Sequence, residues 1–225
     1  MKSPAQRHFE RASAAAAAAT GAPGESLAGA SRYELMLAKL ATDRRRLKQL
    51  QSVERKVAVK REVLPEYADY VAGALEGGRG AQDDVLVTVM VWRIDVGDYD
   101  GALAIAVYAL QHRLTLPDQY ERTLGTVIAE EIAEAALIAI RAEGGKFDVD
   151  QLLQVATLTE ASDMPDQVRA KLHKAIGYAL QDDPAAALPY LRRAVELDDR
   201  VGAKKDIERL EKALKAAGEK SAAST

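Results

Sequence analysis

The chain has 225 residues, of which 48% are apolar and only 5% aromatic. This length suits one medium domain or two small ones, and the scarcity of rings predicts a core of small side chains packed between helices. The net charge of −3 favours no class of partner, and the lack of cysteine excludes disulfides and thiolate metal sites. The apolar run from Val85 to Val91, which Thr88 interrupts, falls far short of the roughly 20 residues that a membrane span needs.

The first 30 residues are rich in alanine and glycine. Residues 1–19 predict a short, weakly anchored helix, and a linker follows at 20–29, marked by Gly21, Pro23, Gly24 and Gly29. We therefore expect a flexible N-terminal segment at 1–30.

A long basic helix is predicted at 31–64. Ser31 and Glu34 form a capping-box pattern at its start, and Pro65 disfavours helical geometry in the residue before it. Apolar residues recur in a partial heptad at Met36, Leu40, Leu47, Leu50, Val57 and Leu64, broken by Asp43, Glu54 and Arg61. Two interpretations stay open, an interrupted coiled coil between subunits and an ordinary amphipathic helix packed on the body.

The charge is unevenly distributed along the chain. Residues 32–62 carry ten Lys or Arg against four Asp or Glu, a local charge of +6, whereas residues 63–225 carry −10. Such asymmetry is typical of nucleic-acid contact, although a solvated helix face would have the same composition. The candidate DNA-binding residues are Arg44, Arg45, Arg46, Lys48, Arg55, Lys56, Lys60 and Arg61.

An acidic body of helical hairpins is predicted at 65–217. After a short helix at 65–76, a hairpin at 82–112 has Asp83 and Asp84 at its start, Gly97 as the left-handed residue and Asp98 as the next cap. Further helices are expected at 127–143, 150–159, 166–181, 184–198 and 201–217, and a disordered tail at 218–225. The pattern of Gly177, Ala187, Leu191 and Ala194 resembles a tetratricopeptide hairpin. The predicted fold is all-α, with a basic N-terminal helix followed by hairpins that are partly tetratricopeptide-like.

The candidates for catalysis are weaker. Asp83, Asp84, Asp95, Asp98 and Asp100 could hold a divalent metal for phosphodiester cleavage, but helix starts and turns already explain aspartate at these positions. The histidines His8, His112 and His173 have no metal-ligand spacing, and the chain has no phosphate-binding loop of an ATPase. We therefore predict no metal site and no cofactor, and catalytic residues stay unassigned.

Several blocks of sequence resemble the small terminase subunit of temperate contractile-tailed phages of the coliphage type. They are SPAQRH at 3–8, YELMLAKL at 33–40, GAQDD at 80–84, MVWR at 90–93 and MPDQVRAKLHK at 164–174. The similarity extends from Ser3 to about Leu214, although the linker at 20–30 is richer in glycine and the tail after 215 is shorter than the family pattern.

The resemblance implies a role in viral genome packaging. Such a subunit binds double-stranded viral DNA at the packaging site, acts as a homo-oligomer in the host cytoplasm without a membrane, and recruits a large subunit with ATPase and nuclease activity. The family's small subunit also bears the label of endonuclease subunit, so the alternative is a metal-dependent enzyme that itself cuts the concatemer.

Overall fold

The computed structural model describes residues 2–22, 31–117 and 122–222, in which ten helices and no extended strand are found. The prediction of an all-α fold is confirmed. The chain divides into two compact units, Met1–Leu124 and Gly125–Thr225. None of the helices in the described ranges has the length and apolar content of a membrane span.

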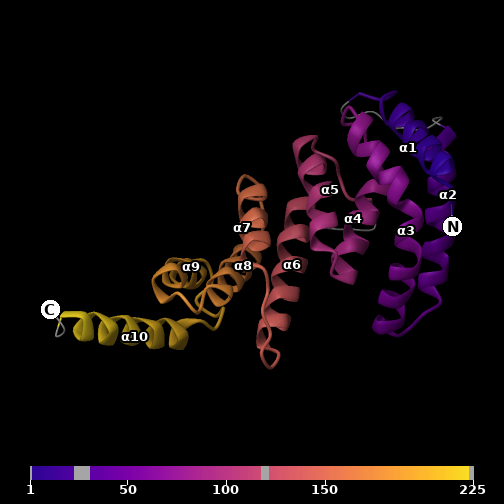
Figure 1. The fold of residues 1–225 in the computed structure, drawn as a ribbon. Helices are drawn as coiled ribbons and strands as arrows, with labels where there is room; N and C mark the ends of the chain where they lie inside the picture. Colours follow the sequence, from indigo (N-terminus) through magenta and orange to yellow (C-terminus); the bar gives the residue numbers. More distant parts are fainter. Residues whose placement is uncertain (1, 23–30, 118–121, 223–225) are drawn as a thin grey trace. The chain divides into compact units, whose positions relative to one another are not determined.

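The first unit is built around α3 (Val53–Gly77), which contacts α1 (Pro4–Ala18), α2 (Ser31–Lys48) and α4 (Asp84–Val96) (Figure 1). A fifth helix, α5 (Tyr99–Gln111), packs on α4. The central position of α3 explains why Tyr67 and Tyr70 on this helix are almost wholly buried.

Helix α1 is held more firmly than the sequence predicts. Ser3 and Gln6 form a capping box at its start, and Ala14, Ala17 and Ala18 are buried. Gly73 and Gly77 on α3 allow the close approach, because a Cβ at Gly73 would lie 2.2 Å from the carbonyl oxygen of Arg11. The expectation of weak anchoring is therefore wrong for 2–19, while residues 23–30 of the predicted linker lie outside the described residues.

The predicted helix at 31–64 is in fact two helices. The chain leaves α2 after Lys48 and enters α3 at Val53, where Ser52 caps the new helix by accepting a hydrogen bond from the Arg55 backbone N–H at 3.3 Å. Pro65 does not end α3 but lies inside it with its ring exposed. One lost backbone hydrogen bond is tolerated there because Leu64 and Tyr67 on either side are buried.

Helices α2 and α3 run antiparallel, as an αα-hairpin (Figure 1). The side-chain pairs Arg46–Glu62 and Asp43–Tyr67 show this direction, since the residue number falls along α3 as it rises along α2. Met36, Leu40 and Leu47 are buried within the chain's own fold. This burial fits the amphipathic interpretation of the heptad, whose register is broken at 49–52, and the interrupted coiled coil between subunits stays a prediction.

The α4–α5 hairpin follows the sequence prediction closely. Asp83 caps α4, Gly97 closes it at a φ of 83°, and Asp98 caps α5. Helix α4 is buried on nearly every side, and its Trp92 meets the Tyr67 ring edge-on with centroids 6.0 Å apart. Ala102, Ala106 and Ala109 on α5 are buried, as their helical spacing predicted.

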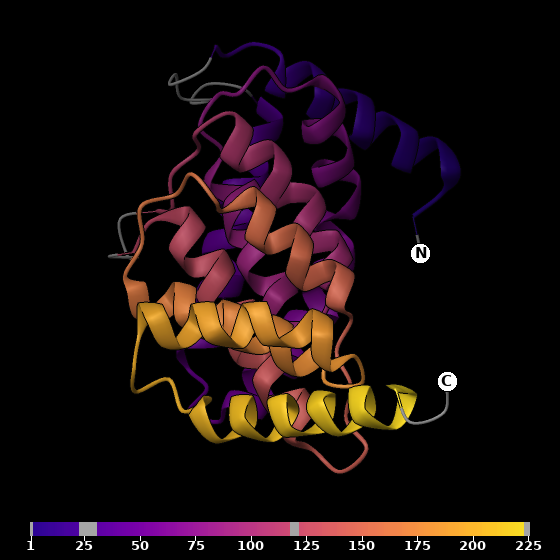
Figure 2. The same ribbon diagram turned by 90° about the vertical axis from the view of Figure 1, so that its left-hand side faces the viewer.

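The second unit contains α6 (Leu124–Arg141), α7 (Val149–Leu158), α8 (Asp166–Ala179), α9 (Pro184–Leu197) and α10 (Lys204–Ala222). Gly177 allows α8 to approach α9, because a Cβ there would lie 2.5 Å from Leu191 Cδ2. Figure 2 shows α10 beside α9, and the salt bridge between Arg192 and Glu211 joins the two helices.

Several bounds differ from those predicted for this unit. Helix α6 begins at Leu124 rather than at residue 127, and α7 begins at Val149, capped by Asp148, rather than at residue 150. Helix α10 runs to Ala222, so most of the predicted disordered tail at 218–225 is helical in its backbone, with 223–225 outside the described residues. The tetratricopeptide-like detail is not confirmed.

Candidate nucleic-acid interface

The eight predicted DNA-binding cations lie on both arms of the α2–α3 hairpin. Arg44, Arg45, Arg46 and Lys48 occupy the last turns of α2, and Arg55, Lys56, Lys60 and Arg61 the first turns of α3. The turn at 49–52 therefore places two basic stretches side by side, whereas the sequence predicted them on one continuous helix. Their surroundings divide the eight residues into three groups.

Two of the cations are neutralised by carboxylates. Arg46 donates two hydrogen bonds to Glu62, at 2.9 and 2.7 Å, and Lys60 forms an ion pair with Asp95 on α4. The bidentate hydrogen bond raises the pKa of the Arg46 guanidinium and lowers the pKa of the Glu62 carboxyl. Each pair is already compensated, so neither cation attracts a phosphate with its full charge.

Two more cations are directed toward the protein itself. Arg44 is partly buried and donates from Nη2 to Thr88 Oγ1 at 2.7 Å, while its Nε is buried without a partner. Arg61 donates to the carbonyl oxygen of Val96 at 3.3 Å, close to the C-terminal end of α4. These contacts connect the hairpin to α4.

The remaining four cations lie next to the turn and have no carboxylate partner among the described residues. Residues 45–56 form the hairpin tip, on which Arg45, Lys48 and Arg55 are exposed and Lys56 is half-buried. Arg45 donates only to the Thr42 hydroxyl, at 3.2 Å. Glu54 is the single acidic residue of the tip, so this end of the hairpin is locally positive.

Two buried tyrosine–aspartate pairs join α3 to α2 and to the start of α4. The hydroxyl of Tyr67 donates to Asp43 at 2.6 Å, and that of Tyr70 donates to Asp83 at the same distance. Asp83 is only 2% exposed, and its burial raises the pKa of its carboxyl to about 6. Burial likewise raises the pKa of both tyrosine hydroxyls.

Sequence reasoning missed this role for Asp43, which it treated as a break in the heptad. The residue occupies an inward position of α2, and Lys39 one turn earlier donates to the same carboxylate at 3.0 Å. The spacing of Lys39 and Asp43 was the one available signal, since such a pair lies on one helix face.

The predicted aspartate cluster does not converge on one point. Asp84 and Asp95 lie at opposite ends of α4, about 16 Å apart at a rise of about 1.5 Å per residue. Asp83 is occupied as a buried helix cap, Asp95 pairs with Lys60, and Asp98 pairs with Arg93 at 3.0 Å while capping α5. Within the described ranges, no three Asp, Glu or His side chains are placed to share a metal ion.

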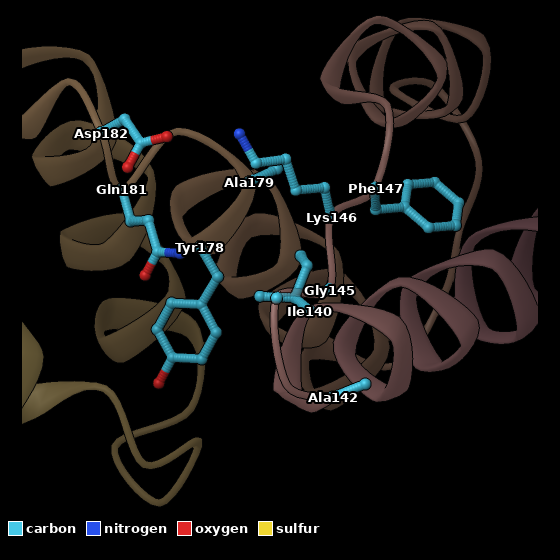
Figure 3. A pocket seen from close by; sticks show the side chains of 10 residues that line it. Ile140, Ala142, Gly145, Lys146, Phe147, Tyr178, Ala179, Gln181 and Asp182 are labelled. Carbon is cyan, nitrogen blue, oxygen red and sulfur yellow. The ribbon is translucent and has the colours of Figure 1, made fainter.

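The second unit contains a hollow of about 380 Å³ between the end of α8 and the loop after α6 (Figure 3). Lys146 and Phe147 come from the loop, and Tyr178, Gln181 and Asp182 from the end of α8 and the residues after it. One cation and one anion line the hollow, so it has no net charge that would select a phosphate. It is not a candidate for nucleic-acid contact.

Comparison with known proteins identifies the family. Residues 37–167, more than half of the chain, match the family described as "Phage small terminase subunit". The chain belongs to the phage small terminase subunit family. The matched stretch includes the hairpin tip, all five aspartates of the α4–α5 hairpin and the first two helices of the second unit.

Two relatives agree with this assignment. The chain is 52% identical over 217 residues to the "Terminase, endonuclease subunit" of Escherichia phage P2, covering 96% of this chain and 87% of the relative. It is 32% identical over 69 residues to the "Probable terminase, endonuclease subunit" of Haemophilus phage HP1, covering 31% and 25% of the two chains. No solved structure matches. The resemblance predicted from the sequence is confirmed, and this small terminase subunit has a role in phage DNA packaging.

Proposed function

We propose that this small terminase subunit binds viral duplex DNA through the hairpin tip and recruits the terminase large subunit to the packaging site in the host cytoplasm. The observation that carries the DNA contact is a group of four cations that have no carboxylate partner in the described part of the chain, namely Arg45, Lys48, Arg55 and Lys56. The proposed site is therefore narrower than the eight residues expected from sequence.

Free and paired cations contribute differently to DNA affinity. A cation that neutralises a phosphate releases a condensed counterion from DNA, and this release is the main source of non-specific affinity. Arg46 and Lys60 would first have to leave Glu62 and Asp95, so their net contribution is small. The four tip cations need no such exchange.

The hairpin geometry favours contact with the phosphate backbone. In a DNA-binding helix-turn-helix, the two helices cross at about 90–120° and the second enters the major groove. Here α2 and α3 are antiparallel, so the tip approaches DNA with the ends of both helices. Phosphate contacts position a protein on the duplex but do not read its sequence.

The test is a salt titration of duplex binding, followed by fluorescence anisotropy. The double variant Lys48→Gln and Arg55→Gln removes two exposed cations of the tip, and we expect the slope of log affinity against log salt to fall by about 1.8. The double variant Lys205→Gln and Lys212→Gln, which removes two exposed cations on α10, is the matched control and should leave the slope unchanged. Unchanged binding by the double variant would refute the assignment of the tip.

A second comparison separates free from paired cations. The double variant Arg46→Gln and Lys60→Gln removes the same formal charge from the same hairpin, but both residues are compensated by carboxylates. We expect its salt slope to change by less than half as much as that of the tip variant. An equal decrease of the salt slope in the two double variants would show that pairing with a carboxylate does not determine which cations contact DNA.

Recruitment of the large subunit and assembly into a homo-oligomer are the further parts of the proposal. The family assignment supports recruitment, because a small terminase subunit works in packaging together with DNA and a large subunit. The homo-oligomer is proposed from the family resemblance alone. Light scattering of the full chain with duplex DNA and with the large subunit measures both properties. A monomer that binds neither partner would contradict this part of the proposal.

Cleavage is the second candidate, because both relatives carry the word endonuclease in their names. We propose that this activity belongs to the assembled terminase, since Asp84 and Asp95 are too far apart to share a metal ion and Asp83 is buried as a cap. The purified chain is incubated with Mg²⁺ or Mn²⁺ and duplex DNA carrying the genome ends. Cutting without the large subunit would overturn this view.

A further inference from the structure

The second unit contains a basic groove that the DNA contact at the hairpin tip does not use. It lies between α6, α8 and the loop from α9 to α10, and it has a volume of about 380 Å³. We call it the α6–α8 groove. The residues that decide its character are Leu137, Ile138, Arg141, Lys171, Lys174 and Arg200.

The groove also contains two acidic residues, but neither is available to a ligand cation. Glu134 is hydrogen-bonded and ion-paired with Lys171. Asp198 accepts a hydrogen bond at 3.0 Å from the Arg200 backbone N–H, as part of the turn that follows α9. Arg200 is itself ion-paired with Asp199 at 4.0 Å. The lining still has four cations against two carboxylates, and Arg141 and Lys174 are the two cations without a carboxylate partner among the described residues, so the groove has an excess of positive charge.

Lys174 is a buried cation that contacts no carboxylate of the described residues. Its side chain is 6% exposed, and its ammonium group donates to one acceptor, the carbonyl oxygen of Val201, at 2.5 Å. An ammonium group has three donors. Burial, and secondly repulsion by Arg141, lower the pKa of the lysine. An anion in the groove would relieve both costs.

Apolar side chains lie directly beside these cations. Ile138 is 71% exposed, although it is a large apolar residue, and Leu137 and Val201 also line the groove. Exposed apolar surface rimmed by polar groups is typical of protein contact sites. A phosphate backbone would leave Ile138 in water, whereas a peptide with an apolar side chain would cover it.

We propose that the α6–α8 groove binds a peptide segment of a protein partner in which carboxylates flank an apolar side chain. Carboxylates of the segment contact Arg141 and Lys174, and its apolar side chain packs on Ile138. This inference stands on the groove alone and is independent of the hairpin tip.

The test uses the full chain and three synthetic peptides in an anisotropy titration up to about 1 mM, the weak end of specific association. The probe contains four glutamates and two leucines. One matched peptide has glutamine for every glutamate, and the other has serine for each leucine. We expect the probe to bind, and each matched peptide to bind at least about tenfold more weakly.

Variants of the chain locate the contact. Arg141→Glu reverses an exposed charge of the groove and Ile138→Ser removes its exposed apolar side chain, and each should weaken probe binding by about tenfold. Lys212→Glu, a charge reversal on the exposed face of α10 outside the groove, is the control and should change nothing. These are exposed positions, so the variants are expected to fold.

Five results would overturn the inference. One is no binding of the probe up to the highest concentration, and another is binding that Arg141→Glu leaves unchanged. A third is equal binding of the serine peptide, which would show that the groove selects charge alone. A fourth is a loss of duplex DNA affinity in Arg141→Glu that Lys212→Glu does not share, which would show that the groove fits a phosphate backbone. Self-association that depends on Ile138 would identify a second copy of this chain as the occupant and would equally contradict a separate partner.

Discussion

The substitution Gly73→Ala tests how closely α1 packs against α3. The added Cβ would lie 2.2 Å from the Arg11 carbonyl oxygen, 2.7 Å from Ala14 Cβ and 2.9 Å from the Ala15 backbone nitrogen. Two of these three atoms belong to the backbone of α1. No change of rotamer can relieve the clash, so the whole of α1 has to move away from α3.

Two opposing effects determine the size of the result. Alanine is a better helix former than glycine by about 1 kcal/mol in a helix interior, which stabilises α3. Overpacking of a close contact costs about 1–3 kcal/mol, and displacing α1 exposes Ala14, Ala17 and Ala18, which are at most 9% exposed now. We expect the steric effect to dominate, with a net loss of about 1–2 kcal/mol in the free energy of unfolding.

Urea unfolding measures the net loss, and amide hydrogen exchange reports which helix is affected. Exchange should accelerate at the backbone amides of Ala14 to Ala18, while α4 stays protected. Ala58→Gly, at an exposed position of α3, is the control. It should lose about 1 kcal/mol through helix propensity alone, with exchange in α1 no faster than in the rest of the first unit. A Gly73→Ala protein that is more stable than the parent, with α1 still protected, would refute the close approach.

Two further predictions concern the α4–α5 hairpin. Asp83→Asn keeps an N-cap side chain but removes a carboxyl whose folded pKa of about 6 lies above its unfolded value of 3.8. A raised folded pKa means that this group's contribution to stability is full below about pH 4 and is lost as the pH rises through about 6. The variant should therefore gain stability relative to the parent between pH 4.5 and pH 7.5 in urea titrations, and a difference that does not change with pH would contradict the buried cap. Gly97→Ala places a side chain at a φ of 83° with no atom within 4 Å of the new Cβ, so we expect a loss of about 1–2 kcal/mol from backbone strain alone. Gly97→Asn should lose clearly less in the same thermal or urea unfolding assay, and equal losses in the two variants would show that the left-handed conformation is not the cause.

Local rules of helix capping account for much of what could be predicted. Asp83, Gly97, Asp98 and Asp183 each act where the sequence placed a helix boundary, because a cap depends only on residues within about four positions. The same reasoning failed at Pro65. Pro65 costs α3 one backbone hydrogen bond, which is a local effect. The burial of Leu64 and Tyr67 outweighs this cost, and that burial depends on the rest of the first unit.

For a similar reason, the sequence could not predict which cations of the candidate site are paired with carboxylates. A count of Lys and Arg located the basic stretch, yet it could not separate Lys48 from Lys60. The partner of Lys60 is Asp95, 35 residues further along the chain, and the hairpin turn at 49–52 decides which cations face that part of the fold. The sequence likewise showed the carboxylates of α4 as a group. The helix between Asp84 and Asp95 is long enough to keep these two carboxylates apart.

The amino-acid sequence alone was sufficient for the all-α class, the α4–α5 hairpin with its caps, and the membership in the small terminase family. These three conclusions depend on residue types and short spacings in the sequence, which do not depend on tertiary contacts. Tertiary structure decided the break between α2 and α3, the docking of α1 on Gly73 and Gly77, and the choice of four free cations among eight. Each of these three features depends on contacts between residues that are far apart in the sequence. Such contacts form only when the whole unit has folded.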